Sequence, residues 1–152
     1  MLNINLDKIT DLDFKTKEAY KTLRTNVQFC GNDVKIISLT SCVPNEGKSM
    51  VSFNLAISMA ETGKKVLFID ADLRKSVLIG RYKINKAIKG LTQYLSGVEQ
   101  LDDVRYSTNV KNMDLILSGP VPPNPAELLN NEKFTELLET ARKEYDYVII
   151  DT

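Results

Sequence analysis

The sequence predicts an α/β fold in which helices flank both faces of a mainly parallel central sheet, giving three αβα layers. Helical and strand-like patterns alternate along the 152 residues, as expected for parallel architectures. Residues 65–70 and 147–151 are nearly continuous apolar runs, the pattern of strands buried on both faces. A Gly-Lys-Ser turn at residues 47–49 joins a further apolar run to a helical pattern, an order typical of phosphate-binding loops.

The first predicted element is a helix over residues 13–30. Its apolar residues recur at helical spacing, so that one face carries Tyr20, Leu23, Val27 and Cys30. A Gly-Asn-Asp turn follows and ends the helix.

The next three elements surround the Gly-Lys-Ser turn. Residues 34–39 are expected to form a strand that leads into the turn, and residues 50–61 a helix that leaves it. Gly63 is expected to stop this helix, and the apolar run 65–70 forms the next strand.

Residues 71–112 are less regular, with a short helix expected at 91–95. A strand is expected at 114–117, followed by a stiff extended connection, because four prolines lie between 120 and 125. Asn124 or Asn131 is expected to cap the helical pattern at 131–143. The last strand is expected at 147–151.

The composition favours one domain of a soluble, reduced, cytoplasmic protein. Twenty basic residues balance twenty acidic ones, so the net charge does not indicate nucleic acid as a partner. No apolar run approaches the roughly 20 residues that span a bilayer, and the first residues do not resemble a signal peptide. Two cysteines make no disulfide framework, and the absence of histidine excludes His-based triads and most metal-hydrolase sites.

The turn before the helix at 50–61 gives the strongest indication of function. Its backbone N–H groups and the positive end of the helix would surround an anion, and Lys48 would add a charge. Ser49 would offer its hydroxyl to Mg²⁺. The usual first glycine of such a loop is replaced by Cys42, which leaves an ordinary strand-to-helix turn as the alternative.

Aspartates close two of the predicted strands. Asp70 ends the run 65–70, and Asp151 ends the run 147–151. The carboxyl ends of parallel strands meet at one edge of the sheet, where ligands bind, so both aspartates are expected near the phosphate loop. Nucleotide phosphates with Mg²⁺ need both a cationic cradle and carboxylates. The combination predicts a P-loop NTPase-type site, although a single such aspartate often only caps a turn.

Asp72 and Arg74 follow Asp70 closely. Asp70 and Asp72 stand at i and i+2, so both would face the site if the strand continued past its end. One would help to position Mg²⁺ while the other accepted a proton from an attacking hydroxyl. Arg74 would neutralise phosphate charge or anchor a loop through a carboxylate, and the alternative is a solvated turn.

Three segments resemble the Walker A, A′ and B motifs of the bacterial tyrosine kinases that act in capsule and exopolysaccharide synthesis. These segments are 42–49 (CVPNEGKS), 67–74 (LFIDADLR) and 148–152 (VIIDT). Two further segments, 90–97 (GLTQYLSG) and 118–129 (SGPVPPNPAELL), are also similar to that family.

The resemblance implies a role for each matching residue. Lys48, Asp70 and Asp72 would be catalytic, with Asp72 activating the substrate tyrosine, although the division of labour between the two aspartates stays open. Mg²⁺ would be held by Ser49, Asp70 and Asp151. ATP would be bound by Arg74 and by the loop residues Pro44, Asn45, Glu46, Gly47, Lys48, Ser49 and Met50.

The resemblance also implies partners. The activity would be an autophosphorylating, ATP-dependent protein-tyrosine kinase that acts on protein tyrosines and regulates polysaccharide synthesis and export. Residues 18–26 resemble the family's Glu-x-x-Arg-x-x-Arg helix, which packs subunits into a ring, so self-association through Glu18, Lys21 and Arg24 is expected. Lys21 replaces the first arginine and cannot make the same bidentate pair. A separate transmembrane activator of the polysaccharide co-polymerase type would recruit the protein from the cytoplasm to the inner face of the plasma membrane.

The domain organisation follows from the same resemblance. Residues 1–12 are expected to be an N-terminal extension, and residues 13–152 the N-terminal part of a P-loop kinase domain that ends at the Walker B strand. Family members continue into further strands and a tyrosine-rich tail, so the fold is expected to be incomplete at its C-terminus.

Two other readings remain open. Partition and cell-division ATPases share the fold and the three motifs, but they carry an additional lysine early in the loop, where this sequence has Val43 and Pro44. The other reading is a shortened nucleotide-binding module that binds a membrane partner and transfers nothing.

Overall fold

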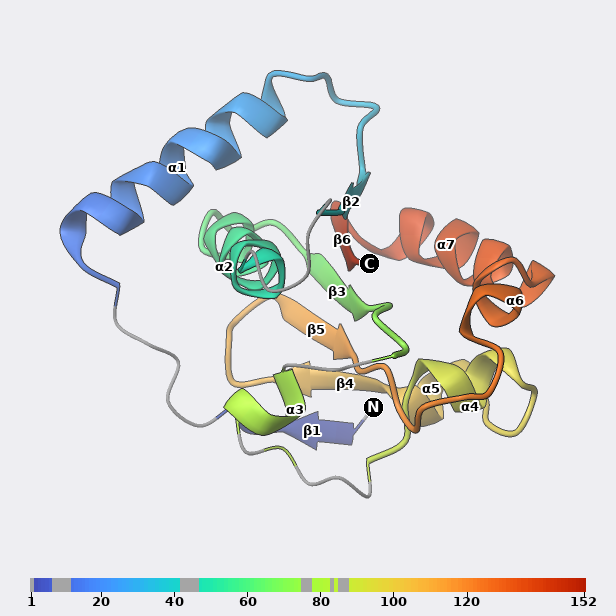
Figure 1. Cartoon of the computed structure of the whole chain (residues 1–152). Helices are drawn as coiled ribbons and strands as arrows, with labels where there is room; N and C mark the ends of the chain where they lie inside the picture. Colours follow the sequence, from blue (N-terminus) through green and yellow to red (C-terminus); the bar gives the residue numbers. More distant parts are fainter. Residues whose placement is uncertain (1, 7–11, 42–46, 75–77, 83, 85–87) are drawn as a thin grey trace.

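The computed structural model describes residues 2–6, 12–41, 47–74, 78–82, 84 and 88–152. Within these residues the strands form one sheet, and helices lie on both of its faces (Figure 1). The strands are β1 (Leu2–Ile4), β2 (Ile36–Leu39), β3 (Val66–Asp70), β4 (Arg105–Thr108), β5 (Met113–Ile116) and β6 (Tyr147–Asp151). The helices are α1 (Phe14–Gln28), α2 (Lys48–Ala60), α3 (Leu78–Arg81), α4 (Leu91–Leu95), α5 (Leu101–Val104), α6 (Pro125–Leu129) and α7 (Glu132–Glu144).

The strand order in the sheet is β1-β4-β5-β3-β6-β2. Neighbouring strands run parallel, except for β4 and β5, which are antiparallel. The prediction of a mainly parallel sheet in an αβα arrangement is therefore confirmed. Because β2, β6 and β3 are parallel neighbours, their carboxyl ends lie together at one edge of the sheet.

Strand β3 shows why the sheet is covered on both faces. Its side chains alternate, so that Phe68 packs in the core cluster under α2 while Leu67 and Ile69 pack in the cluster under α7. The ring of Phe68 meets that of Phe53 from α2 edge to face, with ring centroids 5.2 Å apart. Burial on both faces explains why this strand reads as a continuous apolar run rather than an alternating one.

Helix α1 is shorter than predicted and lies on the same face of the sheet as α2 (Figure 1). Asp13 caps its start by accepting a hydrogen bond from the Thr16 backbone N–H, with N and Oδ1 2.7 Å apart. Leu23 and Val27 pack against the core, as the helical spacing predicted. The assignment of Cys30 to this face was wrong, because the helix ends at Gln28 and Cys30 is exposed in the turn that follows.

The less regular stretch contains three elements that the sequence did not predict, namely α3, α5 and β4. All three are four residues long, too short for a periodic pattern to stand out. Residues 2–4, within the expected N-terminal extension, form strand β1 and pair in parallel with β4.

The Pro-rich connection leads into helices α6 and α7. Pro125 is the first residue of α6, a position that suits proline because its missing N–H would have no helical partner there. Asn131 caps α7 as predicted, accepting from the Lys133 backbone N–H at 2.8 Å. Asn124 precedes α6, but its side chain donates to Glu127 instead of capping the backbone.

The described part of the chain contains no helix whose length and apolar character would let it cross a membrane.

Candidate functional site

The candidate site begins where α2 starts, at the sheet edge formed by the carboxyl ends of β2, β6 and β3. Gly47 precedes the helix with φ 77°, a left-handed conformation that glycine adopts without steric cost. Lys48 and Ser49 then occupy the first turn, where the helix dipole and unpaired backbone N–H groups favour an anion. Pro44, Asn45 and Glu46, also expected to bind the nucleotide, lie outside the described residues.

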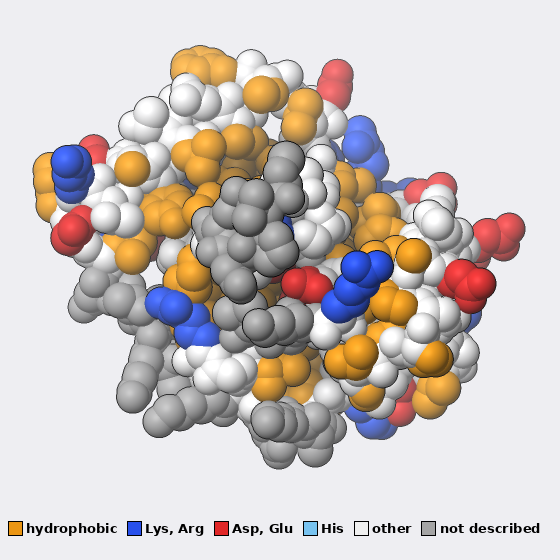
Figure 2. Space-filling view, viewed as in Figure 1, with side chains coloured by type: hydrophobic (Ala, Val, Ile, Leu, Met, Phe, Trp, Pro, Cys, Tyr) orange, Lys and Arg blue, Asp and Glu red, His pale blue; other side chains and the backbone are white. Residues whose placement is uncertain are grey.

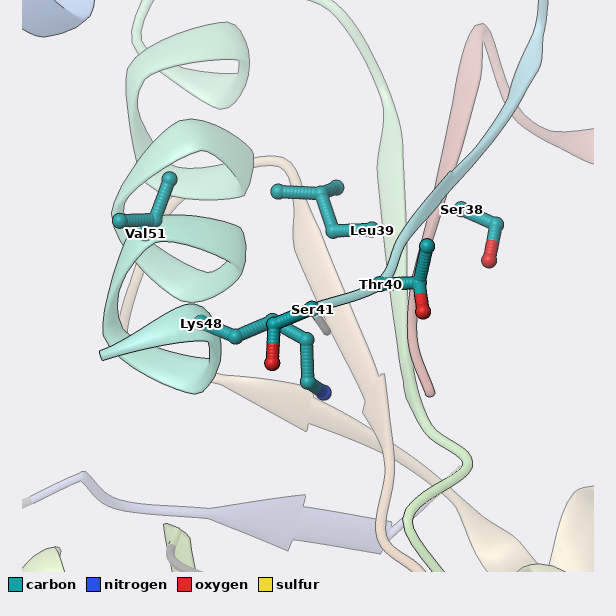
Figure 3. A pocket seen from close by; sticks show the side chains of 6 residues that line it. All are labelled: Ser38, Leu39, Thr40, Ser41, Lys48 and Val51. Atoms are coloured by element: carbon teal, nitrogen blue, oxygen red, sulfur yellow. The ribbon is translucent and has the colours of Figure 1, made fainter. Parts of the chain in front are cut away.

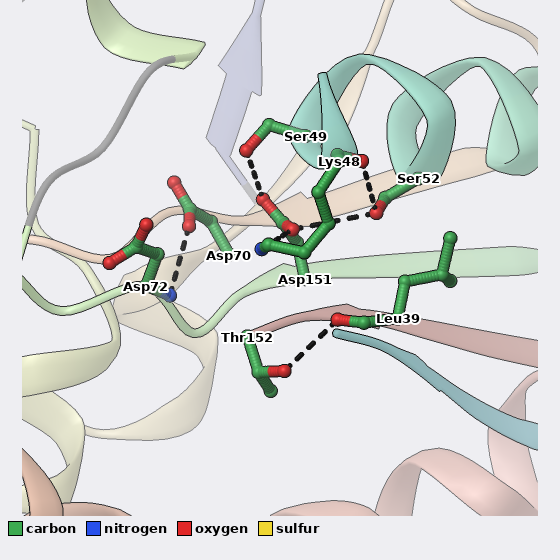
Figure 4. Close-up of polar contacts among 8 residues, drawn as sticks. All are labelled: Leu39, Lys48, Ser49, Ser52, Asp70, Asp72, Asp151 and Thr152. Atoms are coloured by element: carbon green, nitrogen blue, oxygen red, sulfur yellow. Dashed lines mark hydrogen bonds and ion pairs between the residues drawn. The ribbon is translucent and has the colours of Figure 1, made fainter. Parts of the chain in front are cut away.

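Three side chains from the first turns of α2 contact the carboxylate of Asp151 (Figure 4). Its carboxylate forms an ion pair with Lys48 Nζ and accepts a hydrogen bond from Ser49 Oγ at 2.7 Å. Ser52 Oγ lies 3.4 Å from Asp151 Oδ1 and also donates to the Lys48 carbonyl at 2.8 Å. The Asp151 carboxylate is 1% exposed, so these partners stabilise a charge that is almost fully removed from water.

Asp70 lies beside Asp151. The two residues are direct partners in the β3–β6 ladder, and each is 1% exposed. Parallel strands stand about 4.8 Å apart, so two acidic side chains emerge close together at this edge. The predicted gathering of Lys48, Ser49, Asp70 and Asp151 is therefore what the fold produces.

Asp72 reaches the same edge by a turn rather than by a continued strand. Strand β3 ends at Asp70, and the Asp72 backbone N–H then donates to Asp70 Oδ1 at 3.2 Å. Figure 4 shows the carboxylates of Asp70 and Asp72 next to each other, on the side of the site where Ser49 lies. Arg74, two residues further on, is exposed to solvent.

A pocket of about 450 Å³ lies on the other side of Lys48, between the end of β2 and the start of α2 (Figure 3). It is lined by Ser38, Leu39, Thr40, Ser41, Lys48 and Val51. Thr152 links the end of β6 to the end of β2, because both its backbone N–H and its hydroxyl donate to the Leu39 carbonyl. Lys48 therefore has the Asp151 carboxylate on one side and an open pocket on the other.

Ser52 is the site residue that the sequence reasoning missed. It is fully buried, and it stands four residues after Lys48, which places both on one face of α2. A small polar residue four positions after Lys48 was the available signal. Met50 is half-buried in the first turn of α2.

The side chains at this site suit Mg²⁺, which takes some of its ligands from water and phosphate, better than a metal ion that is bound by protein side chains alone. The described residues contain no group of three or more acidic, histidine or cysteine side chains that would hold a metal by themselves. One hydroxyl and two carboxylates, from Ser49, Asp70 and Asp151, match the oxygen ligands of Mg²⁺, which is usually shared with water and substrate phosphates. A nucleotide phosphate would complete such a site.

Figure 2 shows how charge is distributed over the face seen in Figure 1. Basic and acidic side chains are interspersed, mostly around the margin, and hydrophobic side chains gather in the region of α1 and α2. Among the described residues on this face, no broad field of one sign is seen, in keeping with the balance of 20 basic and 20 acidic residues.

Comparison with known proteins agrees with this geometry. Residues 34–152 match the AAA domain family. The chain is 48% identical over 138 residues to the tyrosine-protein kinase CpsD of Streptococcus agalactiae, which covers 91% of this chain and 60% of that protein. The chain thus spans about 60% of the length of such curated relatives.

Solved structures give the same picture. The kinase domain of the Escherichia coli tyrosine kinase ETK superposes with a TM-score of 0.88 at 36% identity, covering 100% of this chain and 60% of that one. The septum site-determining protein MinD of Pyrococcus horikoshii, complexed with Mg-ADP, gives a TM-score of 0.65 at 29% identity and covers 78% of this chain and 48% of its own.

Proposed function

The chain belongs to the AAA domain family, within its bacterial tyrosine kinases, and we propose that it transfers the γ-phosphate of ATP to a protein tyrosine. The observation that carries this proposal is the convergence of Lys48 and Ser49 on Asp151, directly beside Asp70. Phosphoryl transfer needs charge neutralisation and positioning more than covalent chemistry, and this edge of the sheet supplies both.

The proposed reaction uses the residues at the edge in distinct roles. Lys48 and the backbone at the start of α2 bind the phosphates, with Met50 in the same turn, and Arg74, two residues after Asp72, contributes a positive charge to nucleotide binding. Asp72 accepts the proton of the tyrosine hydroxyl. A bond then forms between the tyrosine oxygen and the γ-phosphorus, the bond to the bridging β–γ oxygen breaks, and ADP leaves.

Mg²⁺ would be held by Ser49, Asp70 and Asp151, where it would neutralise charge on the transferred phosphoryl group. Binding the metal requires Asp151 to share its carboxylate between Lys48 and the ion. Because Lys48 also borders the open pocket, its ammonium group can turn toward a phosphate without leaving the site.

We also propose a role in capsular or exopolysaccharide synthesis, with a separate transmembrane activator that recruits the protein to the inner face of the plasma membrane. Self-association would use the exposed face of α1. Glu18 and Lys21 form an ion pair there at 3.1 Å, and their side chains are about half exposed (48% and 52%). Arg24 instead ties α1 to α2, because its Nη1 donates to the Ser58 carbonyl at 2.8 Å and to the Ser58 hydroxyl at 3.1 Å.

Incubation with radiolabelled ATP and Mg²⁺, followed by detection of phosphotyrosine, tests the proposal. Both this chain and a version extended to the length of its relatives are needed. We expect tyrosine labelling that disappears in Lys48→Met. ATP hydrolysis without any phosphotyrosine would favour a partition-type ATPase, and nucleotide binding without turnover would favour a binding module.

A further inference from the structure

Two glycine-containing segments far apart in the sequence touch backbone to backbone beside the candidate site. The Leu91 N–H donates to the Leu117 carbonyl at 2.7 Å, and the Thr92 N–H donates to the Ser118 carbonyl at 3.0 Å. A Cβ atom on Gly90 would lie 2.4 Å from the Gly119 nitrogen, closer than real Cβ atoms approach. The contact therefore requires glycine at position 90.

Gly119 is constrained in two ways at the same contact. Its φ is +80°, which disfavours any side chain, and a Cβ atom there would lie 2.7 Å from Thr92 Oγ1. The Thr92 hydroxyl is buried and has no hydrogen-bond partner among the described residues. An unsatisfied buried hydroxyl weakens a fold, so hydrogen bonding within the fold does not explain why a threonine stands at position 92.

The contact lies at the same sheet edge as the acidic residues. Strands β3 and β5 are neighbours, and Ile69 paired with Ile116 is their last partnership. Asp70 and Leu117 each follow directly, so the segment that begins at Leu117 leaves the sheet next to Asp70. Along this edge the spatial order is β2, Asp151 on β6, Asp70 on β3, and then the segment after β5.

The two sides of the phosphate site differ. On the β2 side, Lys48 borders the open pocket of about 450 Å³, which suits the rest of the nucleotide. In-line transfer requires the acceptor to approach from the side opposite the leaving group. The acceptor would therefore arrive past Asp70 and Asp72, where the segment after β5 stands.

We propose that the contact between residues 90–92 and 117–119 is a positioning device that holds residues 119–124 as a wall against which a tyrosine-bearing peptide docks. Val121, within this wall, is 68% exposed and offers an apolar surface to such a peptide. The inference rests on the proposed kinase function, and it assigns a role to two segments that the phosphate site does not use.

The test measures peptide binding separately from nucleotide binding. The probe is a fluorescein-labelled copolymer of glutamate and tyrosine, bound to the full chain saturated with a non-hydrolysable ATP analogue and Mg²⁺. We expect Gly119→Ala to weaken copolymer binding about tenfold while the Kd of the analogue changes less than about twofold. Gly97→Ala is the matched control, because Gly97 has φ +82° but its Cβ would meet nothing closer than 4.0 Å.

A surface pair separates the wall from effects on folding. Val121→Asp should repel the acidic copolymer and weaken its binding about fivefold, whereas Val98→Asp, at a residue of similar exposure (71%) beyond α4, should not. The double variant Thr92→Ala/Gly119→Ala removes the atom nearest the new Cβ and should restore part of the lost affinity.

The measurements distinguish failure of the wall from failure of the kinase proposal. Unchanged copolymer binding in both Gly119→Ala and Val121→Asp, no copolymer binding by the wild-type chain, or equal losses of copolymer and nucleotide would each overturn the wall. Selective loss of copolymer binding, in a protein that labels no tyrosine even when extended to the length of its relatives, would support the wall and contradict the kinase proposal instead.

Discussion

Asp70 and Asp151 are direct partners across the β3–β6 ladder, and both are almost completely buried at the edge where α2 begins. Lys48 and Ser49 bind Asp151, whereas the backbone N–H of Asp72 donates to Asp70. The two carboxylates are chemically alike but have different neighbours. Substitutions at these positions should therefore have different consequences.

The first prediction separates the roles of Asp70 and Asp72. Asp70→Asn should weaken Mg²⁺-dependent ATP binding about tenfold, because it removes a carboxylate from the proposed metal site. Asp72→Asn should leave that binding within about twofold and lower tyrosine phosphorylation by about a hundredfold, because it removes the proposed base. Titration of ATP with and without Mg²⁺ measures the first effect. Equal loss of metal-dependent binding in both variants would contradict the assignment.

The second prediction concerns the pair of Lys48 and Asp151. Lys48→Met should leave the chain folded but lower its free energy of unfolding by about 3 kcal/mol, because a buried carboxylate loses its cation. The double variant Lys48→Met/Asp151→Asn should recover most of that stability without recovering turnover. Urea unfolding of the two single variants and the double variant gives the coupling. A purely additive double variant would show that the ion pair contributes nothing to folding.

The third prediction is a dependence on pH. Burial and a hydrogen bond from Tyr145 to Asp114, with the oxygens 2.5 Å apart, raise the pKa of Tyr145 well above its ordinary value of 10.0. Because the pKa is higher in the folded state, the neutral Tyr145 phenol contributes its full stabilisation of the fold below about pH 10. That contribution is lost as the pH rises further. Tyr145→Phe should be about 2 kcal/mol less stable than wild type at neutral pH, because it removes the hydrogen bond to the Asp114 carboxylate.

The difference between these two proteins should shrink above about pH 10, since the wild type alone pays the cost of ionising this phenol. Burial also raises the pKa of Tyr82, Tyr94 and Tyr106, so both proteins will still lose stability in alkali. Denaturant unfolding at neutral pH and at about pH 11 compares the two. A difference that stayed constant with pH would contradict the prediction.

The fourth prediction contrasts two carboxylates on one arginine. The Arg105 side chain is 11% exposed and pairs with Glu144, which is 42% exposed, and with Asp102, which is 78% exposed. Glu144→Ala should destabilise the fold by about 2 kcal/mol, because it leaves a mostly buried guanidinium with a single carboxylate near water. Asp102→Ala should cost less than about 1 kcal/mol, as exposed ion pairs do. The reverse order of effects in thermal unfolding would contradict this reading.

Much of the fold could be predicted because a strand buried on both faces has a nearly continuous run of apolar residues. β6 was predicted to the residue and β3 to within one, since strands covered on both faces must be apolar throughout. β1 and β4 lie on the far side of the sheet and mix polar with apolar residues, so their sequences carry no such mark. Their pairing is set by tertiary contacts that a local pattern does not contain.

The candidate site was predictable for a related reason. Parallel strands bring their carboxyl ends to one edge, so a Gly-Lys-Ser turn and two strand-ending aspartates had to meet. The approach of Asp72 through a turn, the contact of Ser52 with Asp151 and the close packing of Gly90 on Gly119 depend on backbone paths outside regular elements. Nothing in residue spacing specifies such paths.

Strand β1 has a consequence for how the chain is made. Its residues leave the ribosome about a hundred residues before β4, the strand with which they pair, and Leu6 and Asn109, joined by hydrogen bonds, are 103 positions apart. During synthesis β1 therefore stays without its partner strand until β4 has also been made, and this edge of the sheet forms late. A bulky fusion placed just ahead of residue 2 would hinder the pairing of β1 with β4. The expected effect is a lower yield of folded protein from cells, with nucleotide binding by the folded protein unchanged.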